Sequence, residues 1–287
     1  MKVVFHADDF GLTPGVNEGI VEAYERGVLR STSLMVTAPA FEDAVERAKR
    51  SPGLDVGVHL TLVEEAPALA PVQIPSLVRG DRFWPTHVAV GLRWLTRRWQ
   101  VDEACSELGA QLARFDDTGL VASHLDGHQH LHLLPGVFSW VTAQARRRDI
   151  RFVRDSLADP LRGGSPQRAA LLMALRSVRW LAAIRANPAD LRTLERFATV
   201  GFLQAGGTLT AERLLEVLER FQRRRPEATV EVMLHPGRPD EEAQRRYGHW
   251  HYHWESDFAL LVDPSLPDEL ARRGIEVTSF RALAGAR

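Results

Sequence analysis

The chain has 287 residues, of which 45% are hydrophobic and 25% are charged, and its formal net charge is −1. This is the composition of a globular protein with a large core, and the balanced charge excludes the basic excess that a nucleic-acid interface needs. Cys105 is the single cysteine, so no intrachain disulfide can form, and we expect a reducing, cytoplasmic location. No apolar run approaches the length of a membrane span.

Strand-like and helix-like segments alternate along the chain. Val3–Ala7 is an expected strand, and Thr13-Pro14 then supplies an N-cap and a first-turn proline for a helix that stops at Gly27. Hydrophobic periodicity predicts the other elements. They are strand 34–37, helix 41–50, strand 56–62, helix 102–115, strand 120–126, helix 137–147, strand 150–153, helix 166–186, strand 197–203, helix 210–223, strand 228–234, a helical stretch at 257–273 and strand 275–279.

This alternation of about seven β/α units predicts a parallel sheet, either closed as a barrel or open and doubly wound. No Gly-x-Gly-x-x-Gly follows the first strand, which removes the main support for a dinucleotide-binding fold. We therefore favour a single-domain β/α barrel spanning residues 1–287. The stretch at 63–99 is rich in proline and aromatic residues and is expected to be an insertion over a site.

Asp8 and Asp9 are adjacent carboxylates at the end of the first expected strand. Neighbouring carboxylates repel each other unless a cation or a shared proton relieves them. One acid could instead cap the next helix while the other is solvated, but Thr13 already supplies that cap. The pair therefore indicates a metal ligand beside a proton-transferring group.

Two single histidines also lie at or near expected strand ends. His59 is the only polar side chain in Val56–Leu60, and in isolation a hydrogen-bonded core histidine is its more usual interpretation. His235 precedes a Pro-Gly turn directly after an apolar run, where it is well placed as a general acid or base. A packing role for His235 is an equal alternative from the sequence.

The segment 123–132 is the densest cluster of candidate ligands. Its composition is typical of a metal site, although spacing alone does not separate ligands from residues that support them or contact substrate. Its candidate side chains are His124, Asp126, His128, His130 and His132.

A second histidine-rich segment, 249–254, alternates histidines with aromatic residues, and we interpret it as a loop that contacts substrate or packs. The sequence leaves open whether His249 and His251 form a second metal site. Cys105 receives no role.

One aspartate and two histidines can form a metal triad with open positions, which leaves the other aspartate and a distant histidine for proton transfer. Such a site suits metal-assisted hydrolysis, in which Asp8 takes a proton from the attacking water and His235 protonates the leaving amine. We expect one divalent ion. Zn, Mg, Mn, Fe and Co all accept this ligand set, and Mg and Zn are the first candidates.

At these residues the chain resembles the YdjC-like carbohydrate deacetylases. The resemblance implies a distorted β/α barrel similar to the polysaccharide deacetylases, and hydrolysis of an N-acetyl group on an amino sugar. The segments that carry it are 7–12 (ADDFGL), 15–20 (GVNEGI), 57–60 (GVHL), 124–132 (HLDGHQHLH) and 235–237 (HPG).

The resemblance also implies roles for single residues. A divalent metal would be held by Asp9, His59 and His128, with Asp8 as the base and His235 as the acid. We further expect substrate contacts from three residues near the site, which are His130, His132 and Trp254.

The segments 51–64, 74–78 and 252–255 are similar to the hopanoid-biosynthesis-associated branch (HpnK) of this family. That similarity implies an acetylglucosaminyl lipid as substrate. The insertion at 63–99 and helix 166–186 would then contact an apolar aglycone or a membrane surface, with an ordinary amphipathic barrel helix as the alternative. The sequence leaves open whether the protein forms a homodimer.

Two other functions compete with the deacetylase. One is another metal-dependent barrel hydrolase, an amidohydrolase or a phosphoesterase, although an amidohydrolase usually carries His-x-His on its first strand. The other is a non-catalytic module that binds sugar or lipid. The candidate proton-transfer pair, Asp8 and His235, argues against pure binding.

Overall fold

The structure is a computed structural model that describes residues 1–154, 198–199 and 208–285. The expected helix 166–186 lies outside the described residues, as does most of the expected strand 197–203. No helix among the described residues is long and apolar enough to cross a membrane.

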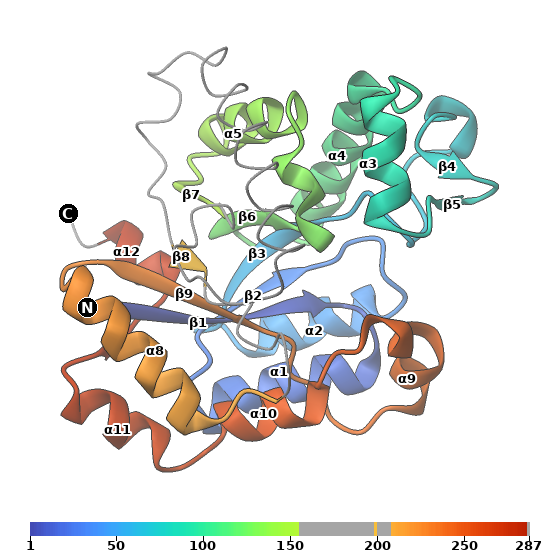
Figure 1. The fold of residues 1–287 in the computed structure, drawn as a ribbon. Coiled ribbons are helices and arrows are strands. Elements are labelled where there is room, and N and C mark those ends of the chain that lie inside the picture. The colour runs from blue at the N-terminus through green and yellow to red at the C-terminus, as the bar shows by residue number, and fades with distance from the viewer. Residues whose placement is uncertain (155–197, 200–207, 286–287) are drawn as a thin grey trace.

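A curled parallel sheet forms the centre of the molecule (Figure 1). Its strand order is β7-β6-β3-β2-β1-β9-β8, with β10 paired to the start of β1. This arrangement confirms the expected distorted β/α barrel. The strands are β1 (Lys2–Phe10), β2 (Ser31–Leu34), β3 (Asp55–Leu60), β6 (His124–Gly127), β7 (Phe152–Val153), β8 (Ala198–Thr199), β9 (Thr229–Leu234) and β10 (Glu276–Val277).

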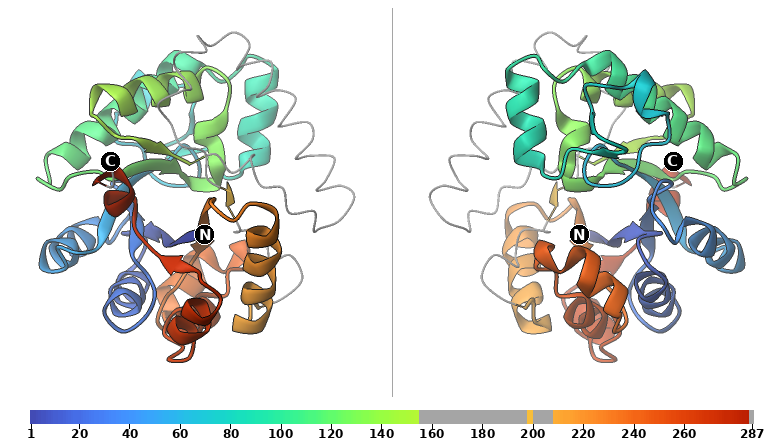
Figure 2. Two further views of the ribbon diagram at one scale, coloured as in Figure 1. Left: turned by 90° about the vertical axis from the view of Figure 1, so that its left-hand side faces the viewer. Right: turned by 90° about the vertical axis from the view of Figure 1, so that its right-hand side faces the viewer.

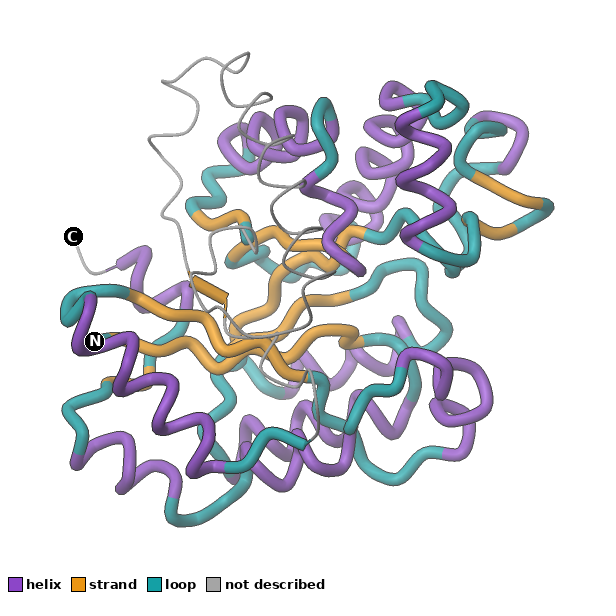
Figure 3. The backbone as a smooth tube through the Cα atoms, viewed as in Figure 1, coloured by secondary structure: helices purple, strands orange, loops and turns teal. Residues whose placement is uncertain are grey.

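Helices surround the outside of this sheet, as the two end views show (Figure 2), and loops at the strand ends join the two layers (Figure 3). The helices are α1 (Pro14–Arg26), α2 (Phe41–Arg50), α3 (His87–Leu95), α4 (Val101–Asp116), α5 (Val137–Arg147), α8 (Ala211–Arg224), α9 (Glu241–Tyr247), α10 (Trp254–Leu261), α11 (Leu266–Arg272) and α12 (Phe280–Gly285).

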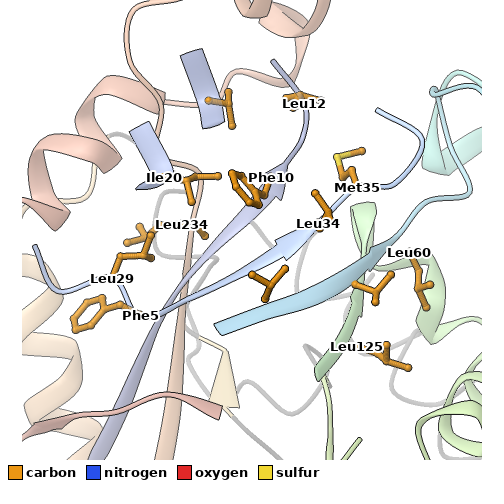
Figure 4. Close-up of a cluster of buried hydrophobic side chains, with 14 of the residues drawn as sticks. Phe5, Phe10, Leu12, Ile20, Leu29, Leu34, Met35, Leu60, Leu125 and Leu234 are labelled. Carbon is orange, nitrogen blue, oxygen red and sulfur yellow. The ribbon is translucent and has the colours of Figure 1, made fainter. Parts of the chain in front are cut away.

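Local signals explain α1, the helix that follows the paired aspartates. The Thr13 hydroxyl accepts a hydrogen bond from the Val16 amide at 3.3 Å, and Pro14 occupies the first turn. The buried side of α1 includes Ile20, which lies beside Phe10 of β1 in the core (Figure 4). This packing anchors the end of β1 that carries Asp8 and Asp9.

The predicted bounds of the second strand, 34–37, are wrong, because the observed strand β2 begins at Ser31 and ends at Leu34. Its first three residues, Ser31, Thr32 and Ser33, are fully buried, so a polar segment forms a strand in the interior. A search for apolar runs misses such a strand, because its buried residues are polar. Their hydroxyl groups are satisfied by hydrogen-bond partners on other strands.

Two other expectations differ in detail. The helical stretch at 257–273 is two helices, α10 and α11, separated by a turn that contains Pro264. The insertion at 63–99 contains regular structure, namely the antiparallel pair β4 (Val78–Arg79) and β5 (Arg82–Phe83), followed by α3.

Gly19 of α1 lies against the turn that follows β9. A Cβ atom at this position would be 2.6 Å from Gly237 Cα and 2.8 Å from the Arg238 nitrogen. We predict that Gly19→Ala lowers the free energy of unfolding by about 1–3 kcal/mol, because the clash involves backbone that cannot move aside cheaply.

Urea denaturation measures this effect, and Gly91→Ala in α3 is the matched control. Apart from the backbone of α3 itself and the two chain neighbours, no heavy atom of the described residues lies within 4 Å of a Cβ at Gly91, so alanine there should stabilise the protein by up to about 1 kcal/mol through helix propensity. Equal effects of the two substitutions would contradict the close packing of α1 on the turn.

Candidate active site

A β-bulge lets two sequence neighbours, Asp8 and Asp9, face the same site. The pairing of β1 with β2 runs from Ala7 opposite Thr32 to Phe10 opposite Leu34, so β1 holds one extra residue. Asp9 lies in this bulge and adopts a left-handed conformation, with φ of 66°. Adjacent strand residues ordinarily point to opposite faces, and the bulge removes that constraint.

Asp9 meets two histidines from other strand ends. Its Oδ1 lies 3.2 Å from His59 Nε2 and 3.0 Å from His128 Nδ1. All three side chains are buried. Burial alone would raise the pKa of Asp9, but His128 and His59 outweigh it and lower that pKa.

Sheet register supplies a partner for His59. Asp126 of β6 lies directly opposite His59 of β3, and its Oδ1 accepts a hydrogen bond from His59 Nδ1 at 2.8 Å. Burial disfavours the charged imidazole, yet Asp126 and the other nearby carboxylates raise the pKa of His59 to about 10. Carboxylates therefore surround His59 at this end of the sheet.

The Asp9, His59 and His128 cluster fits a divalent cation by two observations. Each residue offers a ligand atom, and these atoms lie within 4.8 Å of one another. Asp9 Oδ2 and His128 Nε2 are buried without a hydrogen-bond partner among the described residues, as donor atoms reserved for a metal would be. The Asp126 contact to His59 is also the carboxylate–histidine arrangement typical of metal sites.

Asp8 has different partners, which are Arg154 and the buried His6 of β1, whose Nε2 lies 3.2 Å from Asp8 Oδ1. Arg154, which follows β7, donates to Asp8 Oδ2 from Nη1 at 2.8 Å and to Oδ1 from Nη2 at 2.7 Å. The same guanidinium reaches Asp126 at 2.9 Å and Glu231 at 2.6 Å. Although burial opposes ionisation, Arg154 holds the pKa of Asp8 well below its usual range, so the carboxylate stays charged.

His235 follows β9 and lies at the edge of this cluster. Its Nε2 is 4.0 Å from Asp9 Oδ2, and its backbone N–H donates to Asp257 Oδ2 at 2.9 Å. The imidazole stacks on the Tyr252 ring at 3.9 Å between centroids. The structure thus places Asp8, Asp9, His59, His128 and His235 together at the carboxyl ends of four strands.

The three expected substrate-contacting residues lie around this cluster in different settings. His132 is buried, and its Nε2 is 3.0 Å from the Arg154 carbonyl oxygen, while its ring is 6.4 Å from that of His130. Trp254 lines a cavity of about 280 Å³ together with Tyr252 and Arg238. Contact with substrate stays a prediction for all three.

The histidines of 249–253 are apart from the metal-type cluster. Among the described residues, the groups that could hold a metal include none of His249, His251 and His253. Cys105 lies on α4, where burial and Asp102 raise the pKa of its thiol to about 11. This shift disfavours the reactive thiolate.

Sequence reasoning missed Arg154 and Glu231. Arg154 is one of many arginines, and its partners Asp8 and Glu231 are 146 and 77 positions away, beyond any local motif. Glu231 did leave a signal, because it is a charged residue inside an otherwise apolar strand and is fully buried. An acid at such a position requires a buried cation, and that requirement could have prompted a search for Arg154.

A parallel barrel whose strand ends gather buried aspartates and histidines defines a class of hydrolytic β/α-barrel enzymes. The chain belongs to the YdjC-like protein family, whose match covers residues 2–272. This confirms the family expected from the motifs, and curated relatives named as carbohydrate deacetylases support that enzyme class.

Three comparisons illustrate the similarity. The carbohydrate deacetylase of Vibrio parahaemolyticus is 32% identical over 285 residues, which are 99% of this chain and 96% of that protein. The chitooligosaccharide deacetylase of Salmonella paratyphi B is 30% identical over 291 residues, 97% of each chain. A solved structure of a proposed cellobiose-phosphate cleavage protein from Enterococcus faecalis superposes with a TM-score of 0.74, at 25% identity and 98% coverage of both chains.

The buried ion network predicts a large stability effect at Arg154. Arg154→Met leaves Asp8, Asp126 and Glu231 without their shared cation, so we expect the free energy of unfolding to fall by about 3–5 kcal/mol. Denaturant unfolding with and without a chelator measures this loss apart from any metal contribution.

Arg148→Met is the matched control, because its pair with Asp116 is largely exposed and should contribute at most about 1 kcal/mol. A loss at Arg154 no larger than that at Arg148 would contradict the network.

Proposed function

We propose that this protein is a metal-dependent N-deacetylase that acts on an acetylated amino sugar or its glycoconjugate. The observation that carries the proposal is the division of partners between the two adjacent aspartates. Asp9 contacts the two histidines of the metal-type cluster, whereas Asp8 is held by Arg154 and by His6, which is outside that cluster. The names of the curated relatives support the same reaction.

Asp9, His59 and His128 would hold the metal, which supplies Lewis-acid polarisation of the amide carbonyl when bound. Mg and Zn are the leading ions for this set. Asp126 fixes the ring of His59 through its contact with Nδ1, leaving Nε2 directed toward Asp9.

Asp8 would act as the general base. The Arg154 fork keeps it ionised. His6 Nε2 also lies 3.2 Å from Oδ1, whereas Oδ2 has a lone pair beyond the one that Arg154 occupies. Asp8 therefore accepts a proton from the attacking water while Arg154 fixes the direction of the carboxylate.

His235 would donate a proton to the leaving amine. Asp257 anchors its backbone, and Tyr252 covers one face of its ring. Both ring nitrogens lie outside the Asp126 and Arg154 network, and Nδ1 is buried without a hydrogen-bond partner among the described residues. The imidazole thus remains available for proton transfer at the rim of the site.

A glycolipid, with an acetylglucosaminyl hopanoid as the leading example, is the narrower substrate proposal. One supporting observation is an apolar stripe on α3, where Val88, Leu92 and Leu95 are each more than half exposed. The stripe starts beside the site, because His87 Nδ1 lies 2.9 Å from Gln129 Oε1, next to His128. With this substrate we also propose peripheral contact with a membrane, a homodimeric assembly and a cytoplasmic location.

Free acetate is the product that tests the reaction. The chelated protein is incubated with N-acetylglucosamine, acetylated oligosaccharides and an acetylglucosaminyl lipid, with and without restored Mg²⁺ or Zn²⁺. We expect acetate only after metal is restored. Turnover of aryl phosphates without acetate release would indicate a phosphoesterase, and tight sugar binding without turnover would indicate a binding module.

Asp8→Asn tests the division of roles between the aspartates. We expect kcat for acetate release to fall by about 10²–10⁴-fold, because the amide accepts no proton from water, while metal still binds. Asp9→Asn is the comparison variant and should lose metal. Metal titration and initial rates measure the two effects separately, and an active Asp8→Asn enzyme would contradict the base assignment.

A further inference from the structure

The two histidines of the metal-type cluster differ in how they are held. His59 is bonded through Nδ1 to Asp126, as metal-binding histidines usually are. His128 contacts Asp9 through Nδ1, and its Nε2 has no hydrogen-bond partner among the described residues. Within the described part of the chain, His128 therefore has no polar contact outside the cluster that would set its ring orientation.

An indole ring packs against the His128 imidazole. The ring of Trp250 packs against His128 at 4.8 Å between centroids, with the planes tilted by 49°. Trp250 also contacts Tyr247 at 4.5 Å and Tyr252 at 5.3 Å, and Tyr252 in turn stacks on His235. Trp250 is thus the residue of this aromatic loop that packs on His128, while Tyr252 packs on His235.

Glu64 in the insertion holds the indole in place. Trp250 Nε1 donates to Glu64 Oε2 at 2.6 Å, a short bond to a charged acceptor. The Glu64 side chain is only 12% exposed, so water competes weakly for this bond. His249 adds a longer contact of 3.3 Å to the other carboxylate oxygen.

The backbone at Glu64 is in an unfavourable conformation that its surroundings enforce. Its φ is 64°, in the left-handed region that non-glycine residues rarely adopt. The Glu64 amide donates to the Trp84 carbonyl at 3.0 Å, and Arg82 Nε donates to the Glu64 carbonyl at 3.0 Å. Such residues persist where neighbouring structure determines them, and they are often found at functional sites.

We propose that Glu64 and Trp250 form a positioning pair for His128, with Glu64 orienting the indole and the indole orienting the imidazole. The pair makes the insertion part of the metal site although it contributes no ligand. The inference rests on the proposed metal role of Asp9, His59 and His128.

Zinc affinity tests the pair independently of catalysis. The protein is freed of metal with a chelator and titrated with Zn²⁺ against a chromophoric competitor. We expect Glu64→Ala and Trp250→Ala to raise the Kd for zinc by about 10–100-fold, the usual effect of removing a group that orients a ligand. Glu64→Gln keeps an acceptor for the indole N–H and should rescue most of the affinity.

A second variant separates positioning from folding. Glu64→Gly removes the carboxylate but adopts a left-handed backbone without a steric cost. Thermal unfolding of the metal-free protein should show that this variant keeps its fold while its zinc affinity drops as in Glu64→Ala. Glu241→Ala, at an exposed acid at the start of α9, is the matched control and should bind zinc as the wild type does.

The outcomes separate this proposal from the deacetylase proposal. Zinc binding that is unchanged in Glu64→Ala and Glu64→Gly, or lost equally in Glu64→Gln, overturns the positioning pair. A wild-type protein that binds zinc but releases no acetate overturns the deacetylase and leaves the pair standing. Failure of the wild type to bind zinc overturns the metal site, and the pair with it.

Discussion

Buried negative charge at the carboxyl ends of the strands is the constraint on which the rest of this site depends. Asp8, Asp9, Asp126 and Glu231 are nearly inaccessible to water, and removing such groups from water costs several kcal/mol each unless they are paired. Arg154 compensates three of them at once. Asp9 alone lies outside the reach of the guanidinium and instead faces imidazoles, which makes it the carboxylate with room for a further cation.

The bulge in β1 allows this division of partners. In a regular strand one of two consecutive aspartates would point into the helical layer, away from its neighbour. The extra residue and the left-handed Asp9 turn both carboxylates to the interior, where they reach opposite sides of the site. A single backbone irregularity thus separates two chemically identical side chains into one held by Arg154 and His6 and one that faces His59 and His128.

Local signals in the sequence predicted much of this arrangement, and long-range pairing explains what they missed. Apolar runs located β1, β3 and β9, and polar residues at strand ends led to Asp9, His59 and His235 because parallel strands bring those ends together. The predicted position of the polar strand β2 was wrong by three residues, because a segment rich in serine and threonine resembles a loop in sequence. The role of Arg154 depends on partners in distant strands, which no spacing rule reveals.

The insertion contacts the site without contributing any of the candidate metal ligands Asp9, His59 and His128. Glu64, Arg82 and Trp84 stabilise one another through backbone and side-chain hydrogen bonds, and Trp250 links this small unit to His128. The strand ends that carry Asp9 and His59 are fixed by the sheet, whereas His128 lies in a turn after β6 that contains two left-handed residues, Gln129 and His130. Because a turn constrains a side chain less than a paired strand does, His128 is the point at which a variable loop can influence the centre.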